Sequence, residues 1–292
     1  MLNLQAIRKE RPEWLEQRKI TMEGAVNGMY TKQVLAVSHR WDSPDHPDPS
    51  GKQLMVLRDF LREEANESFQ LVFVDFCCMP QGDRSDTEDV EFGLMLPNVN
   101  LVYLGASVLI LLDRSYLSRF WTQFEAWLSF MAPSPTGLVS ESRAACKRYS
   151  IRLVHGAPEK LRESILEEWG QCTVLSAHLK LSSPDVSVTN QRDKDQQLPK
   201  ILQLDVAIRD HALNSGVGHD LLTSRSMSGH DCDDGGWRAR ALAAESEVEK
   251  LNRLLAQRQP VQVKASNLCG GSKILSAALK RRARAHPPLA QV

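Results

Sequence analysis

The sequence predicts an α/β domain built on a doubly wound parallel sheet. Short runs rich in β-branched residues and leucine lie at 34–38, 71–75 and 107–113, and two of them end in an aspartate. Runs of this kind are typical of strands that are buried on both faces of a parallel sheet. Segments with helical periodicity separate them, and such alternation of strand and helix predicts a doubly wound arrangement.

Each of the remaining elements follows from its own pattern. The first helix is expected over 51–64, where Leu54, Leu57, Phe60 and Leu61 share one side. Further helices are expected at 87–96, 118–131 and 158–169, a fourth strand at 151–154, and another apolar segment at 173–175. In a sheet of this type ligands bind beyond the carboxyl ends of the strands, so the residues that follow each strand are the candidates for a site.

Composition divides the 292 residues into five parts. Charged residues and Pro12 break up the apolar positions at the start of the chain, whereas Ser, Asp, Gln and Gly dominate after about Lys180. The expected parts are a helical extension (1–32), the α/β domain (33–180), a largely disordered polar linker with one helix near 201–211 (181–236), a helix (237–259) and a basic flexible tail (260–292).

The segment 237–259 has apolar residues near heptad spacing. Leu242, Val248, Leu251 and Leu255 lie among Glu and Arg residues, which fits a single amphipathic surface helix or a short coiled coil. The basic run at 280–286 is compatible with a nuclear signal or with contact to an acidic partner, although the pattern is weak.

Charge and hydropathy exclude several classes of protein. With 36 basic and 36 acidic residues the chain has no net charge, so we expect no nucleic-acid partner. The longest strongly apolar stretch, 107–112, is far shorter than the roughly 20 residues of a membrane span, and the first 20 residues lack the apolar core of a signal peptide. We therefore expect a cytoplasmic protein without a membrane span and with reduced cysteines.

Polar and aromatic residues follow the predicted strands. Ser38, His39, Arg40 and Trp41 end the first, Asp75 and then Cys78 follow the second, and Asp113 ends the third. All seven are candidate ligand-binding residues because parallel strands end at one edge of the sheet. The alternatives are structural, with Trp41 packed over the sheet edge, Arg40 paired with a carboxylate and Asp75 capping the following turn.

The helix expected at 118–131 adds an aromatic side chain and a carboxylate. Trp121 and Glu125 are four residues apart, so they share one helical face beside an apolar stripe. Desolvation at such a border raises the pKa of a carboxyl group unless a partner compensates. A carboxylate beside an aromatic platform is typical of a sugar or nucleoside site.

Four motifs in this order resemble the heterokaryon-incompatibility (HET) domain, whose fold is related to TIR domains. They are VSHRW, FVDFCCMPQ, LVYLGASVLILLD and SRFWTQFEAWLS, which together span about 33–131. Trp121 and Glu125 also match the Trp and Glu of the TIR helix signature W-C-x-x-E. The resemblance implies a flavodoxin-like sheet and a role in immune, cell-death or stress signalling.

The resemblance also implies an activity. Some TIR domains cleave NAD at the nicotinamide–ribose bond with the glutamate that matches Glu125, so NAD is the expected substrate and no cofactor is expected. Trp121 or Trp41 would stack on a base, and Asp75 or Arg40 would hold the ribose or the phosphates. The alternative is an adaptor that self-associates through this domain without catalysis, with Glu125 paired to Arg40 or Arg119.

Other chemistries fit the sequence less well. The His and Asp cluster around Cys232 (230–234) contains no Cys-x-x-Cys pair, so no metal is expected there. Burial is the simpler interpretation of Cys77 and Cys78, and the glycines at 216 and 218 follow no strand and lack a Walker lysine.

Overall fold

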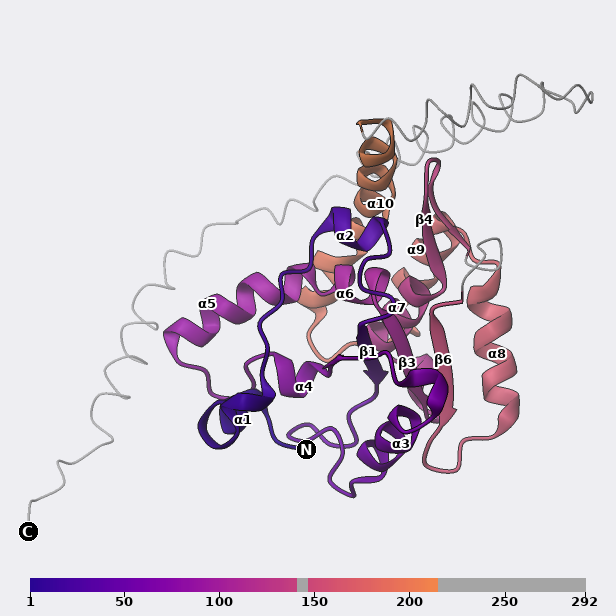
Figure 1. The fold of residues 1–292 in the computed structure, drawn as a ribbon. Helices are drawn as coiled ribbons and strands as arrows, with labels where there is room; N and C mark the ends of the chain where they lie inside the picture. Colours follow the sequence, from indigo (N-terminus) through magenta and orange to yellow (C-terminus); the bar gives the residue numbers. More distant parts are fainter. Residues whose placement is uncertain (141–146, 215–292) are drawn as a thin grey trace, which may run out of the picture. The chain divides into compact units, whose positions relative to one another are not determined.

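The computed structural model describes residues 1–140 and 147–214 of the chain (Figure 1). The helix predicted at 237–259 and the tail predicted at 260–292 lie outside the described residues, as does the expected linker beyond residue 214. Among the helices of the described part, none is both long enough and apolar enough to cross a membrane.

A four-stranded parallel sheet forms the centre of the domain. Its strands are β1 (Val34–His39), β2 (Leu71–Phe73), β3 (Ser107–Leu112) and β6 (Tyr149–Leu153). Their order across the sheet is β2-β1-β3-β6, and each neighbouring pair is parallel. The predicted α/β class with a parallel sheet is therefore confirmed. The second strand ends earlier than predicted because Asp75 begins the helical turn α4 (Asp75–Cys78).

Helices cover both faces of the sheet, and they do so unequally. One face carries α3 (Lys52–Leu61), whose Leu57 and Phe60 pack on β1 and β3. The other face carries the larger core, to which five helices contribute. These are α6 (Asn100–Gly105), α7 (Phe120–Ser129), α8 (Glu159–Gly170), α9 (Val174–Ser182) and α10 (Gln191–Asn214).

The strand order creates a switch point between β1 and β3. The chain leaves β1 through α3 to reach β2 on one side, and it then crosses to β3 on the other side of β1. The connections that follow β1 and β3 consequently run in opposite directions. Open α/β sheets bind their ligands at the carboxyl ends of the two strands where the connections diverge in this way.

Polar side chains fix the starts of several helices. Asp48, which is buried, accepts the backbone N–H groups of Gln53 and Leu54 at 3.1 and 2.8 Å and so stabilises the start of α3. Ser85 and Glu88 form a reciprocal capping box on α5 (Asp86–Met95). Helix α5 matches the prediction at 87–96, whereas α6 was not predicted.

The helix predicted at 118–131 is shorter in the structure. A turn of 3₁₀ helix, η4 (Tyr116–Ser118), precedes α7, and Met131 begins the hairpin of β4 (Met131–Ser134) and β5 (Gly137–Ser140). This antiparallel hairpin is separate from the central sheet and was not predicted.

In the described part of the polar linker expected from residue 181, the helix predicted near 201–211 is present but is longer, and the segment is packed on the domain. Ser187 binds the backbone of Ser118 and Phe120 with hydrogen bonds of 2.9 and 2.8 Å, and α10 follows as a 24-residue helix. Six residues of α10 are buried at spacings of three or four: Lys194, Gln197, Ile201, Leu204, Ile208 and Ala212. The polar composition of this segment suggested disorder because the exposed faces of α10 are polar. The apolar segment expected at 173–175 forms the start of α9, which Thr173 caps at its N-terminus.

The N-terminal extension forms three short elements, as its broken pattern suggests. They are α1 (Leu4–Glu10), the 3₁₀ turn η1 (Pro12–Trp14) and α2 (Met22–Val26). Gln5 makes two hydrogen bonds with the backbone of Gln81, at 2.7 and 3.2 Å, so the extension is attached to the segment that follows β2.

A buried arginine joins the helices that carry the candidate site. The guanidinium of Arg148, just before β6, donates to the backbone oxygens of Tyr103 and Ala106 at the end of α6 and of Leu128 and Ser129 at the end of α7. Carbonyl groups at a helix end lack partners within the helix, and the negative end of the helix dipole favours a cation there. Arg148 thus fixes the position of α7, and therefore of Glu125.

Candidate functional site

The alternation of side chains along β1 divides the predicted site into two networks. Ser38 and His39 are neighbours in the sequence, but successive side chains of a strand point to opposite faces of the sheet. Ser38 points towards α7 and bonds Glu125, whereas His39 points towards α3 and bonds Gln53. The sequence predicted one set of ligand-binding residues, and the structure places them on two sides of the same strand.

The first network surrounds Glu125 with hydroxyl groups. Ser38 donates to the carboxyl group of Glu125 over 2.6 Å and lies 2.5 Å from the hydroxyl group of Tyr116. Tyr103 lies on the same side and its hydroxyl group reaches the backbone oxygen of Val37 at 3.3 Å. All these side chains are buried, and Glu125 itself is 9% exposed.

This environment keeps Glu125 protonated at neutral pH. Burial raises the pKa of Glu125 to about 8, and the negative charge of Asp75 adds to the rise, although hydrogen bonds from Ser38 and Tyr103 oppose it. Burial raises the pKa values of Tyr103 and Tyr116 well above their ordinary value, and Glu125 raises them further once it is ionised. The first network is therefore neutral, as the predicted border position of Glu125 suggested.

The second network joins an imidazole, a carboxyl group and an amide. His39 contacts Gln53 Oε1 through Nδ1 at 2.8 Å and Asp75 Oδ1 through Nε2 at 3.0 Å. Asp75 also accepts the indole N–H of Trp41 at 2.9 Å and the backbone N–H of Phe76 at 2.7 Å. The alternative role foreseen for Asp75, a cap on the following turn, is not formed: Asp75 is itself the first residue of α4, and its side chain accepts the N–H of the adjacent Phe76 and not one further along the turn.

The pKa directions agree with a charged pair. Burial alone would lower the pKa of His39, but the hydrogen bond and charge of Asp75 outweigh it and the pKa is raised. Burial alone would raise the pKa of Asp75, but His39 outweighs it and the pKa is lowered. A carboxylate and an imidazolium stabilise each other in this way when they are desolvated together.

Arg40 belongs to a third group of side chains at the same edge. Its Nε donates to Asp113 at 2.5 Å and its Nη2 to Asp42 at 3.3 Å, and Asp42 in turn faces His155 at 3.2 Å. The expected pairing of Arg40 with a carboxylate is present, but its partners are Asp113 and Asp42. The pairing of Arg40 with Glu125, expected for an adaptor, is not formed.

His155 has a backbone conformation that sequence reasoning could not anticipate. Its φ of 52° is positive, which is uncommon for a residue other than glycine and is found often at functional sites. It follows the carboxyl end of β6, and its imidazole is one-quarter exposed. Three residues were missed as site members: Asp42 and His155, which follow β1 and β6, and Gln53, which lies in the first turn of α3. Nothing in the sequence indicated which way their side chains point.

Two predicted site residues lie apart from these networks. Trp121, which is partly buried, packs edge-on against Phe120 and Phe124 of the core, at centroid distances of 5.8 and 6.2 Å. Cys78 directs its thiol to the backbone oxygen of Val72 at 3.8 Å, and burial raises its pKa. Burial likewise raises the pKa of Cys77 to about 12, so both thiols are protonated.

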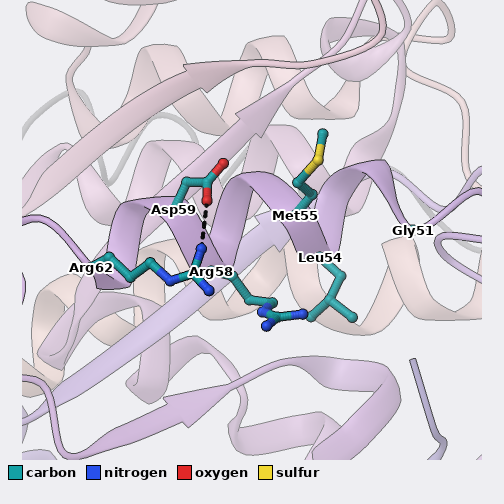
Figure 2. Close-up of a pocket in the computed structure, with 6 residues that line it drawn as sticks. All are labelled: Gly51, Leu54, Met55, Arg58, Asp59 and Arg62. Carbon is teal, nitrogen blue, oxygen red and sulfur yellow. Dashed lines mark hydrogen bonds and ion pairs between the residues drawn. The ribbon is translucent and has the colours of Figure 1, made fainter.

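Two surface hollows lie elsewhere in the domain. One, of about 350 Å³, lies along α3 and is lined by Gly51, Leu54, Met55, Arg58, Asp59 and Arg62 (Figure 2). Figure 2 shows the ion pair of Arg62 with Asp59, 3.2 Å long, on the same helix. The other, of about 520 Å³, lies beside the segment between α9 and α10. Neither hollow is lined by Glu125 or by a strand-end residue.

Within the described residues no group of three or more His, Cys, Asp or Glu side chains has the arrangement of a metal site. The cluster at 230–234 lies outside that part of the chain. Comparison with protein-family models, with curated proteins and with solved structures gives no significant match.

Proposed function

We propose that the domain is a TIR/HET-like signalling domain that hydrolyses the nicotinamide–ribose bond of NAD, with Glu125 as the catalytic carboxyl group. The observation that carries this proposal is the position of Glu125: a carboxyl group with a pKa of about 8, held beside Ser38 next to the switch point of a parallel sheet. Strongly perturbed titratable groups at such a position are typical of active sites.

Three further features support the proposal. The order β2-β1-β3-β6 agrees with the first four positions of the flavodoxin-like order. Asp75 and Trp41, which are partly exposed, offer an acceptor and an aromatic ring at the same edge. The four motifs shared with HET domains supply β1, the segment after β2, β3 and α7, the elements that carry these residues.

The chemistry requires an ionised Glu125. When the glycosidic bond breaks, nicotinamide leaves with the bonding electrons as a neutral molecule, positive charge develops on the ribose, and water adds to the same carbon with loss of a proton. A carboxylate stabilises that charge, whereas a protonated carboxyl group does so far less. Because the nicotinamide ring of NAD is cationic, its approach lowers the pKa of Glu125 and favours the ionised form.

The test is nicotinamide release from NAD by the purified full chain, at high concentration and after artificial clustering. Glu125→Gln replaces a protonated carboxyl group by an amide of the same shape, so the variant keeps the fold but cannot ionise. We expect its rate to fall at least about a hundredfold. Glu163→Gln, the same change at an exposed position of α8, is the matched control and should retain the rate. Absence of wild-type turnover under all these conditions would exclude the proposal.

A non-catalytic adaptor is the second candidate, and a specific observation favours it. Glu125 is 9% exposed and lines neither of the two described hollows, so its carboxyl group offers a ligand little accessible surface. In an adaptor the Ser38–Glu125 network would be a buried polar contact that positions α7 on the sheet. Glu125→Gln would then preserve self-association and signalling, and no NAD would be consumed.

A further inference from the structure

The hydrogen-bond partners of His39 determine which of its nitrogens carry protons. Gln53 places Nε2 within 3.0–3.2 Å of three oxygen atoms, those of the Arg40 and Pro47 backbones and of the Asp42 carboxylate. All three are acceptors, so this atom of Gln53 is the amide nitrogen. Its Oε1 therefore faces His39 as an acceptor, and Nδ1 of His39 must carry a hydrogen.

The other nitrogen of His39 faces an ionised carboxylate. Asp75 accepts N–H groups from Trp41 and Phe76, one on each oxygen, which favours its ionised form. A neutral His39 with its hydrogen on Nδ1 would turn the lone pair of Nε2 towards Asp75 Oδ1 at 3.0 Å, which is repulsive. Both nitrogens of His39 consequently donate.

We propose that His39, with both ring nitrogens protonated, is a positioning residue that holds Asp75 as a receptor for a ribose hydroxyl group. His39 does not touch the ligand, since its side chain is 2% exposed, whereas that of Asp75 is 32% exposed. Two N–H groups occupy Oδ1 of Asp75 and one occupies Oδ2. A carboxylate has about four acceptor positions, so one remains on Oδ2, beside the indole of Trp41.

The charged and titratable groups around His39 fit this assignment. Asp75 faces it from the segment after β2 and Gln53 from α3, and Glu125 of α7 would raise the pKa of His39 only in its ionised form. The raised pKa of His39 and the lowered pKa of Asp75 are consistent with the geometry. This assignment names a ligand group of the proposed NAD site. It depends on the proposed function only in taking the hydroxyl group to be that of a ribose.

The first test is the ¹⁵N spectrum of the histidine rings in the full-length protein, which requires no activity. We expect His39, assigned by the loss of its signals in His39→Gln, to keep two protonated ring nitrogens at pH 7.5, where exposed histidines with a pKa near 6.5 are mostly neutral. A neutral ring at that pH would overturn the proposal. Asp75→Asn should convert His39 to the neutral form with hydrogen on Nδ1, and Asp59→Asn, at an exposed position, should not.

The second test uses adenosine and 2′,3′-dideoxyadenosine as probes, followed through the indole N–H signal of Trp41. Adenosine should shift that signal and bind at least about tenfold more tightly than its dideoxy counterpart, because a hydrogen bond to a charged acceptor is lost in the latter. Asp75→Asn should remove the difference, and Asp59→Asn should preserve it. Equal binding of the two probes, or no shift of the Trp41 signal with either, would overturn the hydroxyl receptor.

The outcomes separate this inference from the proposed function. A protonated His39 with adenosine-specific binding but no nicotinamide release would retain the ribose receptor and exclude the hydrolase. Nicotinamide release that depends on Glu125, together with a neutral His39, would retain the hydrolase and exclude the inference.

Discussion

The two networks on either side of β1 each stabilise a desolvated carboxyl group, and they do so in opposite ways. On the α7 side, burial and hydroxyl partners keep Glu125 protonated, so no charge is buried. On the α3 side, Asp75 and His39 are both ionised and compensate each other. The difference lies in the partners, since a hydroxyl group offers a carboxylate less stabilisation than a cation and several N–H groups do. Two carboxyl groups at one edge thereby acquire different charges, as acid–base sites require.

The largest expected effect comes from removing one member of the ionic pair. Asp75→Ala leaves His39 buried with a charge and no carboxylate, or forces it to lose its proton. We expect a loss of about 3–5 kcal/mol in the free energy of unfolding, the usual result of breaking a buried pair. Urea unfolding at pH 6 measures it. Asp59→Ala, which breaks an exposed ion pair on α3, is the control and should cost well under about 1 kcal/mol. Equal losses in the two variants would contradict the buried pair.

The second prediction concerns pH and the neutral network. The pKa of Glu125 is about 8 in the folded protein and near 4.5 when unfolded, so its contribution to stability is complete below pH 4.5 and is lost as the pH rises to about 8. Glu125→Gln lacks this loss. The variant should therefore gain on the wild type by on the order of 3 kcal/mol between pH 5 and pH 8.5. Parallel stability curves for the two proteins would show that Glu125 is ionised throughout.

A third prediction applies the same change to both networks. At pH 6 the amide in Glu125→Gln replaces a carboxyl group that is neutral in the folded protein but ionised in the unfolded chain, so the variant should not lose stability and should gain up to about 2 kcal/mol in the free energy of unfolding. Asp75→Asn replaces a carboxylate that pairs with an imidazolium and should cost about 2 kcal/mol. Chemical denaturation of the two variants side by side measures the contrast. A larger loss for Glu125→Gln would reverse the assignment of charges.

The smallest effect is expected within the neutral network. Ser38→Ala removes a partner of both Glu125 and Tyr116 and should cost about 1–2 kcal/mol. It should also raise the pKa of Glu125 further, because the hydrogen bond from Ser38 lowers that pKa. The stability loss with rising pH would then extend to higher pH. Ser129→Ala, a buried serine that bonds the backbone of its own helix at Ala126, is the matched control and should leave the pH dependence unchanged.

Much of the fold followed from local patterns. The runs at 34–38 and 107–113 became β1 and β3, and the apolar periodicity at 51–64 became α3. These elements are predictable because a strand buried on two faces shows a continuous apolar run, and a helix buried along one stripe shows apolar residues at helical spacing. Only the part of α10 near 201–211 was predicted, because its apolar positions are spread through a polar segment and their burial depends on the partners that α9 and the hairpin of β4 and β5 supply.

The sequence by itself determined the α/β class, the strands and the polar residues that follow them, since strand propensity and periodicity are local properties. Only the tertiary structure decided that Ser38 and His39 face different helices, that Arg40 binds Asp113 and Asp42, and that Trp121 packs against Phe124. The charge of a buried group depends on which groups surround it in space, and those groups come from segments far apart in the chain. For this reason Glu125 and Asp75, two carboxyl groups in the same motif set, carry different charges in the folded protein.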